Sequence, residues 1–176
     1  NNLIRLLVSQ NGQLVNKLEL SNSLNLNYDT LNRYLDVLVG TYVFYFVRPF
    51  YSNMRKEISK MAKIYLNDLS LKKVFLKEDD QLGYNFMQGS VIENFVFLEL
   101  RQKFNLEDIY FYRTISKSEI DWVVQDQQQF ILAEVKFTNK ISLRNLVQFT
   151  NFAARYAQIK FKIIITKDTL YFDQKN

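Results

Sequence analysis

The chain contains neither cysteine nor histidine among its 176 residues. Without cysteine it can form no disulfide bond and no thiolate metal site, which fits a reducing compartment. Without histidine it cannot supply a Ser-His-Asp triad, a histidine-ligated zinc ion or a histidine general base. Any chemistry must therefore come from carboxylates, lysine, tyrosine, serine or threonine.

Long apolar runs are missing as well. No run approaches the roughly 20 residues that cross a membrane, and no signal peptide is visible, so we expect a cytoplasmic protein without a membrane partner. The four glycines, at positions 12, 40, 83 and 89, cannot build the phosphate-binding pattern Gly-x-x-x-x-Gly-Lys-Ser/Thr. The chain begins with Asn rather than Met, so we expect it to be a piece of a longer protein.

Basic residues outnumber acidic ones, 23 to 18, and their distribution matters more than the total. Between Val135 and Lys167 the chain has seven basic residues and no acidic one, and a second basic run covers residues 48–63. Stretches of one sign favour a polyanionic partner, most often nucleic acid, which we expect here to be DNA. The other reading is an ordinary solvated surface.

The first third of the chain reads as helical. Leu3, Leu6 and Leu7 have helical spacing. A short helix is predicted to end near Leu24, and another covers residues 28–39, where Gly40 would end it. The β-like runs "YVFYFVRPF" and "AKIYLND" follow and could pair with each other. Helix, turn, helix and β-hairpin is the order of a winged helix.

A winged helix suggests DNA binding, so the outward face of its second helix matters. The residues on that face sum to a negative charge: Asp29, Asn32, Arg33 and Asp36. A helix that reads the major groove should not be acidic. We therefore favour a packing or protein-contact role over a sequence-specific transcription regulator, although the basic wing could still touch phosphates.

A charged, irregular stretch around Leu82 divides the chain, so we predict two domains, residues 1–82 and 83–176. The second half reads helix, strand, strand, strand, helix, strand: "SVIENFVFLELRQKF", "DIYFYRT", "EIDWVVQ", "FILAEVKF", "SLRNLVQFTNFAARYAQ" and "FKIIITK". A mixed sheet flanked by helices follows from that order. The expected fold class is α/β, a winged-helix part followed by this sheet.

Three charged residues interrupt the apolar strands. Asp121 lies within Ile-Asp-Trp-Val-Val, and Glu134 and Lys136 lie within Ile-Leu-Ala-Glu-Val-Lys-Phe. Side chains two residues apart share a face of a strand, so Glu134 and Lys136 point the same way. If the two strands form a hairpin, Asp121 and Glu134 can converge at one end of the sheet. On the preceding helix, Glu93 has helical spacing with Phe97, so we expect it to face the sheet too.

This set of side chains suits a hard divalent ion. Buried charges are costly unless they are paired or bind a metal. Glu93, Asp121 and Glu134 offer the oxygen ligands that Mg²⁺ or Mn²⁺ prefers, and Glu119 is expected to lie outside that set or in solvent. Such an ion can lower the pKa of a bound water and polarise a phosphoryl oxygen, while Lys136 orients that water. Carboxylate oxygens of Asp121 and Glu134 within about 5 Å of each other would suit one such ion.

Asp121, followed by Glu134-Val135-Lys136, resembles the Asp…(Asp/Glu)-x-Lys signature of the PD-(D/E)xK, or restriction-endonuclease-like, nuclease superfamily. Glu93 resembles the additional carboxylate of the Holliday-junction-resolvase branch. The order helix, three strands, helix, strand is also the core order of that superfamily. The resemblance implies a nuclease-like core with Asp121, Glu134 and Lys136 as catalytic residues and a Mg²⁺ or Mn²⁺ cofactor.

A second resemblance covers nearly the whole chain. The segments that carry it are "LNRYLDVL", "RPFYSNMRKEISKMAKIYLNDLSL", "GSVIENFVFLEL", "YFYRTISKSEIDWVV" and "ILAEVKF", which together are similar to the DUF4143 domain. That domain lies at the C-terminal end of many prokaryotic AAA-type ATPases, which implies an ATPase module upstream in the same polypeptide. Ser70 stands where the family commonly has glycine, a difference that bears on a turn and not on the carboxylates.

The acid-free basic stretch also supplies candidate contacts to nucleic acid, namely Lys140, Arg144, Gln148 and Arg155. Gln148 shares a helix face with Arg144 and Arg155. It could contact phosphate, support the carboxylate site, or be an ordinary polar residue on a helix face.

Each site residue has an ordinary structural reading too. Asp121 could cap or pair with Arg113, Glu134 and Lys136 could form an ion pair on an edge strand, and Glu93 could lie on a helix surface. The function we predict is that of a Mg²⁺-dependent DNA-binding and phosphodiesterase domain. The alternative is a non-catalytic protein- or DNA-interaction module that couples the ATPase to a partner.

Overall fold

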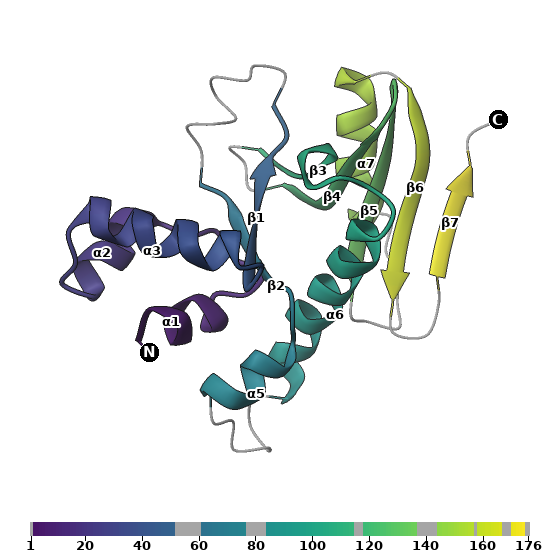
Figure 1. Ribbon diagram of the computed structural model, residues 1–176. Coiled ribbons are helices and arrows are strands. Elements are labelled where there is room, and N and C mark those ends of the chain that lie inside the picture. The colour runs from purple at the N-terminus through teal and green to yellow at the C-terminus, as the bar shows by residue number, and fades with distance from the viewer. Residues whose placement is uncertain are drawn as a thin grey trace. The chain divides into compact units, whose positions relative to one another are not determined.

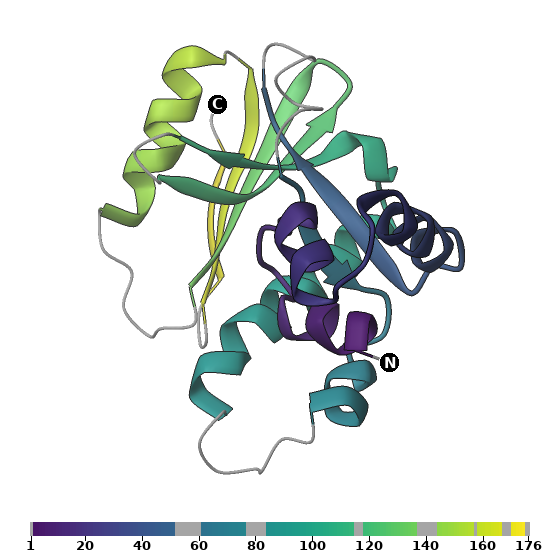
Figure 2. The same cartoon turned by 90° about the vertical axis from the view of Figure 1, so that its left-hand side faces the viewer.

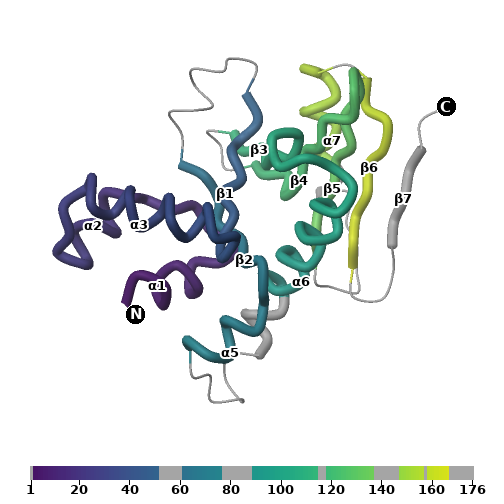
Figure 3. The backbone as a smooth tube through the Cα atoms, in the orientation of Figure 1, coloured from purple at the N-terminus to yellow at the C-terminus, as the bar shows by residue number. Residues whose placement is uncertain are grey.

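The computed structural model describes residues 2–51, 61–76, 84–114, 118–136, 144–156, 158–166 and 170–174, without the side chains of 84–88, 144–146 and 170–174. Within these residues the protein is mixed α/β, with six α-helices and seven β-strands (Figure 1; the parts outside the description are grey in Figure 3). None of the helices described is long and apolar enough to cross a membrane.

The chain divides into two compact units, and each has a hydrophobic core of its own. Unit 1 contains Asn1–Val47 and Ser59–Leu98, and unit 2 contains Arg48–Ile58 and Glu99–Asn176. Both units therefore combine segments that are far apart in the sequence. The domain boundary near Leu82 is a division of the sequence and stays a prediction.

Unit 1 begins with three helices, which are α1 (Asn2–Ser9), α2 (Lys17–Ser23) and α3 (Tyr28–Gly40). Asn16 and Asn27 precede α2 and α3, and their side-chain oxygens accept backbone N–H groups of the first turn. These N–H groups have no partner inside a helix, so an asparagine cap determines where each helix starts. The third helix ends one residue later than predicted, because Gly40 is still helical and Thr41 caps it.

A strand pair and two further helices complete unit 1. β1 (Phe44–Pro49) runs antiparallel to β2 (Lys63–Leu66), which confirms the predicted pairing of these two runs. α5 (Ser70–Leu76) lies in a stretch predicted to be irregular, because its lysines interrupt the apolar pattern. α6 (Tyr84–Arg101) begins before Ser90, the predicted start.

The core of unit 1 gathers apolar side chains of α1, α2 and α3 against β1 and β2. Its buried members are Leu7, Val8, Val15, Leu20, Leu31, Leu35, Phe44, Ile64 and Leu66. Burying one such large side chain contributes about 1.5–3 kcal/mol relative to leaving it exposed. Leu31 and Leu35 lie four residues apart in α3, so they share its inner face, and both are buried.

Unit 2 is built on a mixed sheet. Its strands are β3 (Ile109–Arg113), β4 (Glu119–Asp126), β5 (Gln129–Lys136), β6 (Ile159–Thr166) and β7 (Leu170–Gln174), and the last residues of β1, Arg48 and Pro49, pair with β3. The strand order from that end is β1-β3-β4-β5-β6-β7 (Figure 1). Only the β1–β3 and β5–β6 pairs are parallel. This confirms the predicted mixed sheet, whereas β7 was not predicted.

The helix α7 (Arg144–Arg155) connects the parallel strands β5 and β6 and lies across one face of the sheet (Figures 1 and 2). Parallel neighbours require such a crossover. Phe149 and Phe152 of α7 are buried against side chains of four strands, namely Tyr112, Ile120, Val123, Leu132 and Ile164. This face of α7 is the apolar one, so the helix is held by hydrophobic burial.

Candidate functional site

The strands β4 and β5 separate at the point where their charged residues lie. Their ladder of hydrogen-bonded partners reaches Trp122 opposite Ala133 and then ends. Beyond that point β4 continues to pair with β3, and β5 continues to pair with β6 as far as Lys136. The register of β3 and β4 also shifts between Tyr110 and Tyr112, which places an extra residue in β4 near Asp121. We call this place the strand fork.

Asp121 and Glu134 replace the missing ladder at the strand fork. The backbone N–H of Asp121 donates to Oε2 of Glu134 at 3.1 Å, and the backbone N–H of Val135 donates to Oδ2 of Asp121 at 2.8 Å. Each carboxylate therefore accepts a backbone N–H of the neighbouring strand. Such bonds favour the ionised form of a carboxylate. The prediction that the two residues converge at one end of a hairpin agrees with this geometry.

Glu134 is a buried carboxylate with a cation beside it. The residue is 2% exposed, and Nζ of Lys136 donates to its Oε1. A buried charge needs such a partner, because without it the loss of hydration is not offset. An ion pair between Glu134 and Lys136 on one face of a strand was the structural alternative to a metal site, and the structure contains this pair. That alternative also placed the pair on an edge strand, which is wrong, because β5 lies between β4 and β6.

The surroundings of Lys136 keep its ammonium charged. Burial by itself would lower the pKa of Lys136, but the charges of Glu134, Asp121 and Glu119 together, with the hydrogen bond to Glu134, raise it above the ordinary value. Lys136 is therefore a fixed positive charge at neutral pH and not a general base. Three carboxylates act on this one lysine, so all four side chains belong to one electrostatic cluster.

Arg113 forms an ion pair with Glu119. Its Nε lies 3.6 Å from Oε2 of Glu119. From the sequence, Asp121 was the possible partner of Arg113. Arg113 and Glu119 are opposite each other in the register of β3 and β4. Sequence reasoning treated Glu119 as an outer or solvated residue. Its position two residues before Asp121 in the same strand was the available signal.

Glu93 lies in unit 1, on α6. Its Oε1 accepts hydrogen bonds from Nζ of Lys63, at 3.0 Å, and from the hydroxyl of Tyr65, both on β2. Lys63 is almost fully buried, so Glu93 offsets a buried positive charge there. The prediction that Glu93 faces inward from α6 agrees with this contact. Its role as a metal ligand stays a prediction.

A metal site at the strand fork depends on two carboxylates. Among the residues that the structure describes, no group of three or more acidic side chains is placed to hold a metal ion. Mg²⁺ is often held by one or two carboxylates together with several waters, so Asp121 and Glu134 fit such an ion by number and by chemistry. Both would have to share their oxygens with the backbone N–H groups that they now accept.

The four residues predicted to contact nucleic acid lie on or before α7. Lys140 falls outside the described residues, and Arg144 opens α7 with its side chain outside the description. Gln148 is 9% exposed, so it is a buried polar residue and not part of an exposed polar face. Arg155 is exposed, and its Nη1 donates to the hydroxyl of Tyr112 at 3.2 Å. Arg155 is therefore the candidate phosphate contact whose side chain the structure places at the surface.

Two family models match the chain. Residues 88–175, which contain the strand fork, match the family described as "Domain of unknown function (DUF4143)". Residues 1–82 match the one described as "Domain of unknown function (DUF8612)".

The chain is also similar to curated proteins that are named only as uncharacterized. One from Mycobacterium tuberculosis is 31% identical over 140 residues, which cover 78% of this chain and 32% of that protein, and one from Mycobacterium bovis matches equally well. One from Haemophilus influenzae is 25% identical over 140 residues, covering 77% of this chain and 33% of that protein. The chain thus spans about a third of the length of these relatives. No solved structure matches it significantly.

Proposed function

This chain belongs to the DUF4143 family, and we propose for it a Mg²⁺- or Mn²⁺-dependent phosphodiesterase site, acting on DNA, at the strand fork. The observation that carries the proposal is the joining of Asp121, Glu134 and Lys136 by hydrogen bonds where two strands separate. A site that hydrolyses phosphodiesters without histidine needs carboxylates to bind the metal ion and a nearby lysine, and here they lie on adjacent strands. In this proposal unit 2 has a PD-(D/E)xK-like core, and the helices and strand pair of unit 1 correspond to a winged helix.

In the proposed site, Asp121 and Glu134 hold the divalent ion together with water molecules. Bound there, such an ion would lower the pKa of a water and polarise a phosphoryl oxygen. The two carboxylates are held in position by backbone N–H groups of the opposite strand, so their oxygens have a fixed separation before any ligand arrives. Preorganised ligands avoid the free-energy cost of arranging them during the reaction.

Lys136 stabilises charge in this mechanism. Its raised pKa keeps the ammonium protonated at neutral pH, so it can donate hydrogen bonds but cannot remove a proton from water. Lys136 would therefore orient the attacking water and stabilise the negative charge that develops on the phosphate oxygens. Glu134 restricts where the ammonium can lie, because it is bonded to it.

The ATPase connection and the nucleic-acid partner are parts of the same proposal. The relatives are about three times as long as their match to this chain, which leaves room for an ATPase module in the same polypeptide. The net charge of +5 and the acid-free basic stretch favour DNA as the substrate.

The test compares cleavage of duplex, branched and single-stranded DNA by the full-length protein with ATP and Mn²⁺. Lys136→Ala should abolish cleavage and largely keep DNA binding, because lysine is not a ligand of these ions. Lys160→Ala is the matched control, since Lys160 is also a paired lysine of the unit 2 sheet but bonds to Asp126, at the far end of β4. Full-length protein without any cleavage that depends on Lys136 would contradict the proposal.

An interaction module is the second candidate, and an apolar hollow in unit 1 favours it. The hollow has a volume of about 580 Å³ and lies between α1 and α3, where Leu3, Ile4 and Leu38 line it. Tyr34 and Val37 also line it and are 50% and 61% exposed. Exposed apolar surface of this kind often marks a contact site. Val37→Glu should then remove binding of a partner and leave cleavage unchanged, which would separate the two functions.

A further inference from the structure

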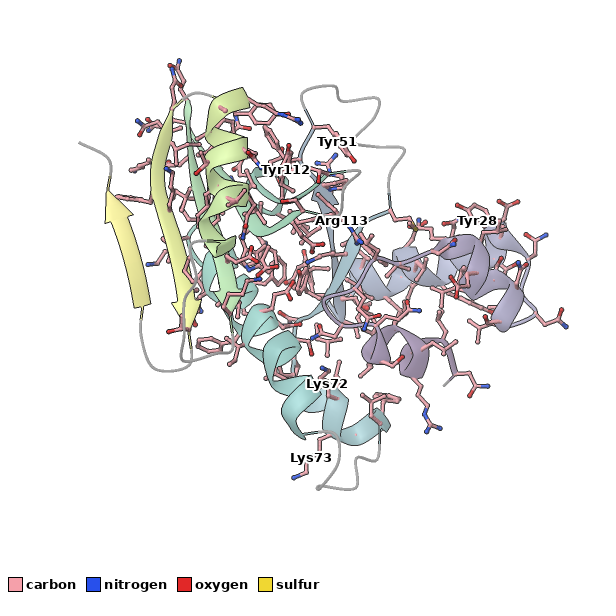
Figure 4. All side chains as sticks on the ribbon, turned by 180° about the vertical axis from the view of Figure 1, so that it is seen from behind. Tyr28, Tyr51, Lys72, Lys73, Tyr112 and Arg113 are labelled. Atoms are coloured by element: carbon pink, nitrogen blue, oxygen red, sulfur yellow. The ribbon has the colours of Figure 1, made fainter. Side chains whose placement is uncertain are left out.

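The strand fork has a second cation besides Lys136. Arg113 lies at the end of β3 (labelled with Tyr112 in Figure 4), opposite Glu119 in register. Glu119 is two residues from Asp121 along β4, which is roughly 7 Å of strand. Arg113 therefore belongs to the β3–β4 side of the strand fork, and Lys136 belongs to the β5–β6 side.

The ion pair between Glu119 and Arg113 is long and partly exposed to solvent. The Nε–Oε2 distance is 3.6 Å, beyond an ordinary hydrogen bond, and the two side chains are 34% and 26% exposed. Within the described residues Glu119 is the only ion-pair partner of Arg113. A guanidinium has donors on Nη1 and Nη2 as well as on Nε, so it can bind a further anion without leaving Glu119.

The backbone directly after Arg113 is well held. The backbone N–H of Thr114 donates to the carbonyl of Ser118 at 2.9 Å, and the N–H of Ser118 donates to Oγ1 of Thr114 at 3.0 Å. The strands β3 and β4 thus stay paired directly beside Arg113. A cation on a fixed backbone loses no backbone freedom when it binds a ligand, which favours recognition.

A second cation at the strand fork would favour a phosphate ligand. Glu119, Asp121 and Glu134 act on Lys136 as three nearby negative charges. Carboxylates repel a phosphate, and a nearby positive group weakens that repulsion. Among the described residues, Arg113 and Lys136 are in ion-pair contact with these carboxylates. Lys136 is already bonded to Glu134, so Arg113 is the other cation of the strand fork.

We propose that Arg113 is a second phosphate-contacting residue of the strand fork, which binds the DNA backbone through Nη1 and Nη2 while Glu119 holds its Nε. Arginine suits this role because its planar fork matches two phosphate oxygens at once. The inference rests on the proposed function in taking DNA as the ligand, but it requires no cleavage.

The experiment measures binding of a short fluorescein-labelled DNA duplex to the full chain by anisotropy, in EDTA and over a series of salt concentrations. Arg113→Gln should weaken binding about tenfold and reduce the slope of log K against log salt by about one. Arg113→Lys should fall between this variant and the wild type, since it keeps the charge and loses the two-point contact. Glu119→Gln should bind more tightly than wild type, because a negative charge is removed from the strand fork.

Lys160→Gln is the matched control. Lys160 is 39% exposed and paired with Asp126 at 28%, much like Arg113 and Glu119, but it lies at the other end of β4. Its loss should change the affinity and the salt slope much less than Arg113→Gln does. If Lys160→Gln and Arg113→Gln weaken binding equally, the effect is one of general charge and the proposal is overturned. The proposal is also overturned if Arg113→Gln binds the duplex as tightly as wild type, or if the wild-type chain binds no duplex. Failure of the nuclease proposal would be seen in the separate cleavage assay, in which no cleavage would depend on Lys136.

Discussion

At the scale of a single residue, Glu134 places a buried carboxylate in the strand fork. It accepts a hydrogen bond from Lys136 and another from the backbone N–H of Asp121. Its charge is stabilised by these bonds and not by water, because the residue is almost fully buried. Removing Lys136 takes away one of these partners, which weakens the stabilisation of the buried charge.

We therefore predict that Lys136→Met destabilises the protein by about 1–2 kcal/mol, a range below that of fully buried pairs because the lysine side chain is 34% exposed. Urea denaturation followed by circular dichroism measures this change. The double variant Glu134→Gln/Lys136→Met should recover part of the loss, because the buried charge is then removed together with its partner. Equal stability of Lys136→Met and wild type would show that Glu134 does not need its partner.

The same pair predicts a dependence of stability on high pH. The pKa of Lys136 is raised in the folded protein above its ordinary value of 10.5, so the folded state binds this proton more tightly than the unfolded state does. The stabilisation is complete below pH 10.5 and is lost as the pH rises through the folded pKa. The difference in unfolding free energy between wild type and Lys136→Met should therefore shrink as the pH rises above 10.5. A difference that grows in that range would contradict the sign.

At the scale of one element, the helix α3 depends on its cap. The side chain of Asn27 accepts the N–H of Asp29 at 2.8 Å, and this N–H has no partner within the helix. Asn27→Ala should destabilise unit 1 by about 1 kcal/mol, while Asn27→Asp should keep the cap. Thermal unfolding compares the two variants. Asn22→Ala, on the exposed face of α2, is the control and should not destabilise.

At the scale of the whole molecule, two separate cores predict two regions of stability. Leu31 is fully buried in the core of unit 1 and Phe152 in the core of unit 2. Leu31→Ala should cost about 2–5 kcal/mol and Phe152→Ala about 3–5 kcal/mol. Amide hydrogen exchange read by mass spectrometry should show each loss of protection mainly in the unit that carries the substitution. Equal loss in both units would mean that they unfold as one.

Periodicity alone determined much of this protein. The alternation of side chains along a strand placed Glu134 and Lys136 on one face, and the structure joins them by a hydrogen bond. Helical spacing placed Leu31 and Leu35 on the inner face of α3. The absence of histidine and cysteine limited the chemistry to oxygen and amine groups. All of these follow from neighbours along the chain, which the sequence displays directly.

Other features were decided by contacts between distant segments. The bond of Glu93 with Lys63 and Tyr65 joins α6 to a strand about 30 residues earlier, and no local spacing indicates it. The strand fork depends on where the β4–β5 ladder stops and on the shift of register between β3 and β4. A shift of one residue changes which side chains oppose each other, so the pairing of Arg113 with Glu119 could not be read from either strand alone. The sequence by itself determined which charged residues the strands carry, while register, a property of strand pairs, decided which of them meet.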